Sequence, residues 1–278
     1  MRLTPSQQPS CDQVDLADFV AEHSDCLVQE RWGRAPADFK FVTLGEFYAE
    51  ARREVPIWAI DRDQGRYVFH DNLLDANDPS SAERIDEFVN GHPPTDEFVE
   101  LSRRLPCVGL RFALGGPDSG TPTPHVHGAV QCLVLAGQKR WWIWPPSAEL
   151  VIDWLVRGMQ ARNRLEYWMT HLAPIFAGQS GDVTVELFEA IEELTRRGIF
   201  LPSTLDPRSE YDAELFARLG QVSRERRGIL AEDFQPRAIT QLAGQSVYLP
   251  EGWSHSVRNQ EWCLAVIYEL RRDQVLRR

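Results

Sequence analysis

Two blocks of this chain share a strand-like pattern, and a long helical stretch separates them. In "CVGLRFALGG" (107–116) apolar side chains alternate with other residues up to a glycine pair, and the same texture returns over 236–269. Alternation with a period of two is typical of β-strands, whereas residues 147 to about 235 have helical spacing. We therefore expect strands from both blocks to form one antiparallel β-structure of the jelly-roll kind, interrupted by a helical insertion at about 147–235.

The boundaries of the first block can be placed more closely. A strand opening at "HVHGAV" and a second strand "QKRWWIW" are expected on either side of Ala136 and Gly137. The pair Pro145–Pro146 is expected to end the second of these strands, because proline cannot donate a backbone hydrogen bond to a sheet.

Residues 1–106 mix short helical and strand patterns. Thr43 and Glu46 have the spacing of a capping box that opens a helix. The segment 65–74 is expected to contain a strand, and 81–90 and 95–104 are expected to be helices. The expected organisation is an α/β flank over 1–106 and a β core over 107–278, which makes the fold mainly β with α additions.

Charge and composition exclude several partners. The net charge of -11 and the pI near 5.2 argue against nucleic-acid and anionic-membrane surfaces, which need clustered basic residues. No apolar run approaches the ~18 residues of a membrane span, and no signal-peptide core follows the N-terminus. The five cysteines are odd in number and lack C-x-x-C spacing, so no disulfide framework is indicated. We expect a cytoplasmic protein whose substrate is a small molecule or another protein.

Three histidines stand out from the seven in the chain. His125 and His127 are one residue apart, and on a strand they would point to the same face. His255 lies in the second strand block, just after a turn that contains glycine. Three neutral imidazoles are a competent site for Fe(II), Zn(II) or Cu(II), although an H-x-H pair also arises by chance.

Three segments, in order, carry a family resemblance: "FALGGPDSGTPTPHVHG", "LVLAGQKRWWIWPP" and "AGQSVYLPEGWSHSVRN". They resemble the motifs of the Jumonji C (JmjC) proteins of the cupin superfamily, most of all the subgroup in which H-x-H-G is followed by G-x-K-R-W. The likeness is close over 107–146 and 236–269, loose over 40–106 and absent from the insertion. Such proteins are typically Fe(II)- and 2-oxoglutarate-dependent oxygenases built on a double-stranded β-helix, so the resemblance implies that fold and that activity.

The resemblance also implies a metal site. His125 matches the first metal ligand of the family and His255 the distal one. His127 stands where most catalytic members have Asp or Glu, and this exchange removes one negative charge from the ligands of the metal. Three-histidine iron sites also occur in other cupin oxygenases. No catalytic residue beyond the metal ligands is expected.

A cosubstrate site follows from the same comparison. Lys139 matches the lysine that pairs with the C5 carboxylate of 2-oxoglutarate, and it is one of only two lysines among the 30 basic residues. A compact ammonium suits such a position better than a forked guanidinium. Thr121 and Thr123 flank the position where the family often has a hydroxyl, and Gln131 is a candidate for the amide that assists the cosubstrate.

Three functions remain open from the sequence. The first is an Fe(II)- and 2-oxoglutarate-dependent hydroxylase, which Lys139 favours. The second is a three-histidine metallocupin that uses iron, zinc or another divalent metal without 2-oxoglutarate. The third is a non-catalytic JmjC-like binding or scaffold protein, which the presence of His127 in place of a carboxylate favours.

Overall fold

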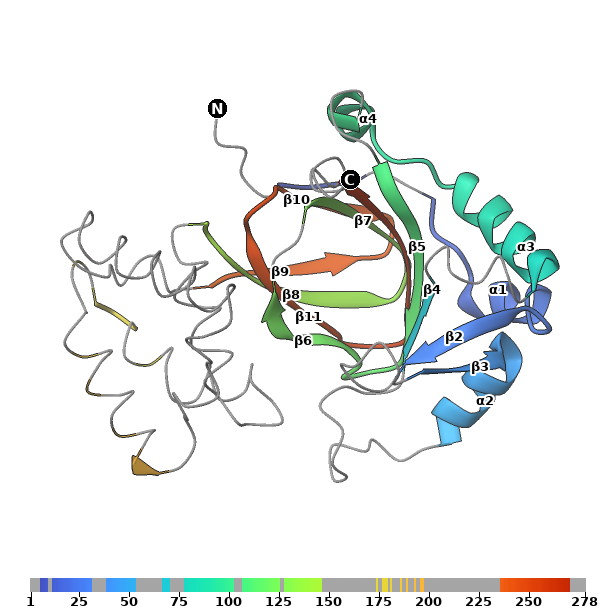
Figure 1. Cartoon of the computed structure of the whole chain (residues 1–278), viewed down its shortest axis with the longest axis horizontal. Coiled ribbons are helices and arrows are strands. Elements are labelled where there is room, and N and C mark those ends of the chain that lie inside the picture. The colour runs from blue at the N-terminus through green and yellow to red at the C-terminus, as the bar shows by residue number, and fades with distance from the viewer. Residues whose placement is uncertain are drawn as a thin grey trace, which may run out of the picture.

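Two antiparallel sheets make up most of the computed structural model, one of eight strands and one of four. Figure 1 shows the two sheets facing one another, with the helices on the outer side of the larger sheet. The structure describes residues 6–9, 12–31, 39–53, 67–70, 78–102, 107–125, 128–146 and 236–270, with isolated positions between 174 and 197. The expectation of a mainly β fold with helical additions is confirmed.

Strands from both blocks interleave in each sheet. In spatial order the larger sheet holds β1 (Ser6–Pro9), β10 (Gln245–Leu249), β7 (Ala129–Ala136), β12 (Cys263–Leu270), β5 (Cys107–Gly115), β4 (Tyr67–His70), β2 (Leu27–Arg31) and β3 (Phe39–Thr43). The smaller sheet holds β6 (Gly120–His125), β11 (Ser254–Asn259), β8 (Gln138–Trp144) and β9 (Arg237–Leu242). Every neighbouring pair is antiparallel, so the two blocks form one sheet system as expected.

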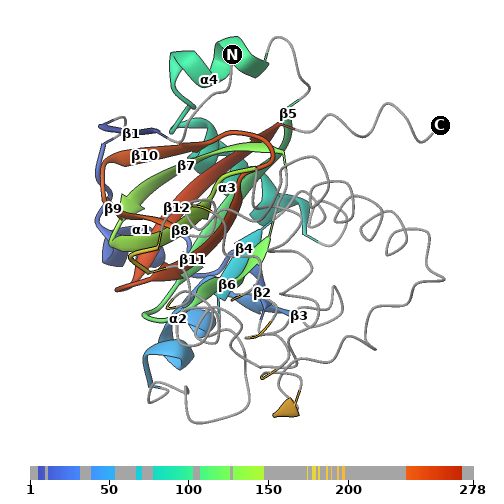
Figure 2. The ribbon, with the colours of Figure 1, turned by 90° about the vertical axis from the view of Figure 1, so that its left-hand side faces the viewer.

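Four helices come from the N-terminal region: α1 (Leu16–Glu22), α2 (Leu44–Arg53), α3 (Pro79–Asn90) and α4 (Asp96–Ser102). Figure 2 shows α4 at the top of the sheets and α2 at the bottom. The capping box that opens α2 is confirmed. The amide of Thr43 donates to Glu46 Oε2 at 3.0 Å, and the amide of Glu46 donates to Thr43 Oγ1 at 3.2 Å. Two otherwise orphaned helix donors are thereby satisfied.

One hydrophobic core lies between the helices and the larger sheet. All four helices contribute buried side chains to it, including Phe47 from α2 and Ile85 from α3. They pack against alternate residues of the strands beneath, such as Phe112 of β5 and Leu133 of β7. The helices therefore pack on one face of the larger sheet.

A second core lies between the two sheets. Trp141 and Ile143 of the smaller sheet pack there with Val134 of β7 and Ala265 of β12. Strand β7 is buried along its whole length because its two faces serve different cores. This double burial explains the nearly continuous apolar run in the sequence of β7.

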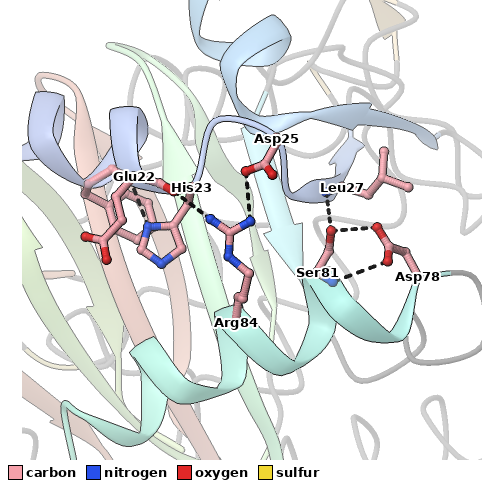
Figure 3. A network of polar contacts seen from close by, with 8 residues as sticks. Glu22, His23, Asp25, Leu27, Asp78, Ser81 and Arg84 are labelled. Carbon is pink, nitrogen blue, oxygen red and sulfur yellow. Dashed lines mark hydrogen bonds and ion pairs between the residues drawn. The ribbon is translucent and has the colours of Figure 1, made fainter.

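A polar network fastens α3 to the N-terminal elements (Figure 3). Asp78 caps α3 and accepts a hydrogen bond from the Ser81 hydroxyl at 2.6 Å, while that hydroxyl accepts one from the amide of Leu27 at 2.8 Å. One turn further along α3, Arg84 Nη1 lies 2.8 Å from Asp25 Oδ1. The pKa of Asp25 is lowered, chiefly by this hydrogen bond.

Some boundaries differ from the sequence expectation. His125 is the last residue of β6, whereas we expected it to begin the strand that continues as β7. Gly137 does join β7 to β8, with a φ of 76°, and β8 ends before the proline pair. The helical insertion expected at 147–235 lies outside the described residues, apart from isolated positions. Among the helices that the structure describes, none is long and apolar enough to cross a membrane.

Candidate functional site

A cavity of about 230 Å³ lies between the two sheets and is lined by residues of both. Much of its wall is apolar, with Val130 and Ile267 on the larger sheet and Val257 on the smaller. A few polar side chains also line it, among them Lys139 and His255. An apolar cavity with a small number of convergent polar groups is the usual form of a small-molecule site.

Two of the three predicted metal ligands meet at this cavity. His255 on β11 is the register partner of His125 at the end of β6, and their ring centroids are 4.3 Å apart with the planes tilted by 51°. Directly opposite residues on antiparallel strands carry their side chains on the same face, which brings these two rings together. The pair is therefore built across two strands.

The hydrogen bonding of His255 sets its tautomer. His255 is 3% exposed, and its Nδ1 lies 3.3 Å from the carbonyl oxygen of Trp253. Because a carbonyl only accepts, Nδ1 carries the proton in the neutral ring and the lone pair is on Nε2. A neutral imidazole held in this way by a backbone carbonyl is the usual state of a metal-binding histidine.

The third predicted ligand, His127, lies outside the described residues, as does the side chain of Thr123. Within the described part of the chain, no group of three or more His, Cys, Asp or Glu side chains has the arrangement of a metal site. The three-histidine site therefore stays a prediction, of which the structure places two members side by side.

Lys139, on β8, lines the same cavity. It is 6% exposed, and its Nζ donates to Asn259 Oδ1 at 3.2 Å. Among the described residues it forms no ion pair; its hydrogen-bond partner is the neutral amide of Asn259. A buried ammonium with so little compensation is costly, so this position is suited to an anionic ligand.

The buried thiol of Cys263 lies near the same ammonium. Burial raises the pKa of Cys263 to about 11, and the charge of Lys139 acts in the opposite direction. The thiol is therefore neutral at physiological pH and adds no anion to this end of the cavity.

Two further residues were predicted to bind the cosubstrate, Thr121 and Gln131, and the structure places them differently with respect to the cavity. Thr121 is half-buried and lines the cavity. Gln131 is not among the residues that line it. Its neighbours Val130 and Cys132 line the cavity, so the strand period turns Gln131 toward the opposite face.

Gln131 has a structural role there. Its Oε1 accepts from the amide of Thr95 at 2.9 Å, and its Nε2 donates to Thr95 Oγ1 at 2.7 Å. Thr95 directly precedes α4, so Gln131 fastens the start of that helix to the sheet.

Sequence reasoning missed Asn259 and Glu269, two polar residues that line the cavity. Asn259 lies four residues after His255, and the period-two rule puts His255, Val257 and Asn259 on one face of β11. Glu269 is 1% exposed and also lines the cavity. A single acidic residue in the otherwise apolar strand "CLAVIYEL" was the available signal for it.

Comparisons with known proteins add little to this site. No family model matches the chain, and no curated protein matches it. The X-ray structure of ycfD from E. coli is similar at 10% sequence identity and a TM-score of 0.37, over 97% of this chain and 50% of that chain. The chain thus spans about half the length of that protein, and a likeness at this TM-score supports neither a fold nor a function.

Proposed function

We propose that this protein is an Fe(II)- and 2-oxoglutarate-dependent oxygenase, of the hydroxylase type, built on a double-stranded β-helix. The strand order supports the fold. Of the eight strands from β5 to β12, the larger sheet takes β5, β7, β10 and β12, and the smaller takes β6, β8, β9 and β11. A jelly roll would divide its antiparallel strands between two facing sheets in this way, which supports the proposed fold.

The observation that carries the proposal is the buried ammonium of Lys139 in a cavity that also holds two adjacent imidazoles. Lys139 is the register partner of Asn259, and His255 lies four residues away along the same strand. At ~3.3 Å per residue this separates the two points by ~13 Å of strand. A ligand with an acid group at each end suits a cavity that has a cation at one point and imidazoles at another.

The histidine pair suits a divalent metal. His125 and His255 present imidazoles side by side, and His127 is proposed as the third ligand. Imidazole suits Fe(II) and also Zn(II) and Cu(II), so the donor set allows iron without selecting it. When bound, iron supplies the redox chemistry with O2. The overall reaction converts 2-oxoglutarate, O2 and a substrate C–H bond into succinate, CO2 and the corresponding alcohol.

The residues of this chain have separate roles in that reaction. Lys139 binds the distal carboxylate of 2-oxoglutarate by a charge-assisted hydrogen bond. Thr121 offers a hydroxyl at the cavity wall, and the apolar side chains of Val257 and Ile267 keep water from the reacting groups. The substrate that is hydroxylated, a protein or a small molecule, approaches the histidine pair.

A cosubstrate assay tests the proposal. Protein purified without oxygen and loaded with iron is expected to bind 2-oxoglutarate and to form succinate from it in the presence of O2. Lys139→Ala should weaken 2-oxoglutarate binding about 10- to 150-fold, because a hydrogen bond to a charged group is lost, while metal binding is retained.

The matched control is Lys40→Arg, which changes the only other lysine of the chain, on β3. It should leave 2-oxoglutarate binding as it is in the wild type. The proposal fails if the wild-type protein neither binds 2-oxoglutarate nor forms succinate. The remaining functions would then be a metallocupin without this cosubstrate or a scaffold protein.

A further inference from the structure

A chain of buried hydrogen bonds leads from the ammonium of Lys139 to the turn at 116–119. Lys139 Nζ donates to Asn259 Oδ1 at 3.2 Å, and Asn259 Nδ2 donates to Ser119 Oγ at 2.9 Å. The hydroxyl of Ser119 then donates to the carbonyl oxygen of Gly116 at 2.6 Å. Asn259 is 3% exposed and Ser119 is 1% exposed, so water does not compete for these contacts.

The single proton of the Ser119 hydroxyl fixes the direction of these hydrogen bonds. A serine hydroxyl has one proton, and that of Ser119 goes to Gly116, so toward Asn259 the hydroxyl only accepts. Asn259 must therefore turn its NH2 group to Ser119 and its oxygen to Lys139. A flipped amide would set NH2 against the ammonium and lose both hydrogen bonds. The turn at 116–119 thus determines which atom of Asn259 faces the lysine.

Backbone hydrogen bonds also hold Asn259 against the turn at 116–119. The amide of Asp118 donates to the carbonyl of Asn259 at 2.9 Å, and the amide of Asn259 donates to the carbonyl of Ser119 at 2.8 Å. A Cβ atom at Gly115 would lie 2.2 Å from Ser119 Oγ and 2.9 Å from Asn259 Nδ2. Glycine at this position leaves the space that the two polar side chains occupy.

We infer that Asn259 is a positioning residue that makes the cavity selective for a ligand with a distal carboxylate, because it holds the ammonium of Lys139 with a neutral oxygen. Aspartate would accept the same hydrogen bond, but it would also neutralise the ammonium inside the cavity, where charges interact strongly. The neutral amide orients the cation and leaves its charge for the ligand. The identity of that ligand rests on the proposed function.

Binding of two 2-oxo acids tests the inference. The probes are 2-oxoglutarate and 2-oxopentanoate, which has the same chain length and lacks the distal carboxylate, titrated calorimetrically without oxygen into iron-loaded protein. Asn259→Asp should weaken 2-oxoglutarate binding about 10- to 150-fold, and Ser119→Ala about 2- to 10-fold. Binding of 2-oxopentanoate should stay within about twofold of the wild type in both variants. Equal weakening of the two acids would show a merely structural role and overturn the inference.

A second measurement needs no ligand. The chain contains two lysines, Lys40 and Lys139, so protein labelled with ¹³Cε-lysine gives two NMR signals, which Lys40→Arg assigns. Ser119→Ala and Asn259→Asp should each move the Lys139 signal and leave that of Lys40 in place. If Asn259→Asp does not fold, as circular dichroism would show, Ser119→Ala still provides both measurements.

The two measurements separate the inference from the proposed function. If wild-type protein binds no 2-oxoglutarate but the Lys139 signal moves as expected, Asn259 positions the lysine and the proposed function fails. If wild-type protein binds 2-oxoglutarate but both variants bind it equally well and the Lys139 signal is unmoved, the proposed function stands and the inference fails. An unmoved signal without ligand binding overturns both.

Discussion

Replacing Lys139 by methionine should stabilise the ligand-free protein while removing its response to 2-oxoglutarate. Lys139 is 6% exposed, and Asn259 Oδ1 is its one hydrogen-bond partner among the described residues. Apolar residues of similar volume stabilise proteins by about 1–4 kcal/mol when they replace buried ion pairs, and the buried ammonium of Lys139 should follow the same rule. The lost hydrogen bond to Asn259 Oδ1 lowers this gain in unfolding free energy by about 1 kcal/mol. We therefore expect a net gain of about 0–3 kcal/mol, which at about 2 °C per kcal/mol raises Tm by up to about 6 °C.

The assay is urea unfolding of metal-free protein at pH 7, with no 2-oxo acid present, because a bound ligand would itself raise stability. In a second series, 2-oxoglutarate and iron without oxygen should raise the unfolding midpoint of the wild type and leave that of Lys139→Met unchanged. Lys40→Met is the contrasting variant. Lys40 is 47% exposed and lies 3.4 Å from a carboxylate oxygen of Glu30, which is 1% exposed, so its loss should lower stability.

A lower urea midpoint for Lys139→Met than for the wild type would refute the reasoning, provided that the slope of the unfolding free energy against urea concentration is unchanged. That result would mean that the fold itself compensates the ammonium, and that Lys139 does not require an anionic ligand.

Three further predictions concern other parts of the molecule. His255→Ala should abolish specific metal binding, measured as metal stoichiometry after dialysis, and unchanged stoichiometry and affinity would overturn the proposed metal site. The control is His92→Gln, because His92 forms a hydrogen bond with the carbonyl of Phe88 instead. Thr43→Ala should lower the free energy of unfolding by about 0.5–2 kcal/mol through loss of the cap on α2, and an unaltered urea midpoint would contradict this. The pKa of Asp25 is lowered by Arg84, so the stabilisation by this pair is present above the ordinary carboxyl pKa of about 4 and is lost as the pH falls through the lowered value. The stability difference between wild type and Arg84→Met should therefore shrink in acid, and a pH-independent difference would show that the pair does not contribute.

Periodicity predicted the strands well and their faces less well. The alternation in β5 and the apolar run of β7 gave the right elements, because burial on one or both sides of a strand leaves a direct trace in the sequence. Periodicity does not say which face borders the cavity. Gln131 faces away from the cavity, although Val130 and Cys132 beside it do line the cavity.

The histidine pair shows the same limit at the site. The sequence grouped His125 and His127 with His255 without giving the register between their strands, and the structure pairs His125 with His255 across β6 and β11. Register between strands more than a hundred residues apart depends on tertiary pairing, which spacing along one strand does not encode. Asn259 was within reach of sequence reasoning, because it shares the face of His255 by the period-two rule.

The position of β12 has a consequence for the order in which the protein assembles. This strand is the last of the described strands in the chain, yet it lies between β7 and β5 in the middle of the larger sheet. Until it arrives, β5 and β7 have no common neighbour, and each presents an open edge that can pair with another chain. Strand β1, from the other end, is equally dependent on β10. Contacts of such long sequence separation slow folding, so we expect the newly made chain to stay prone to aggregation until its distant segments have met.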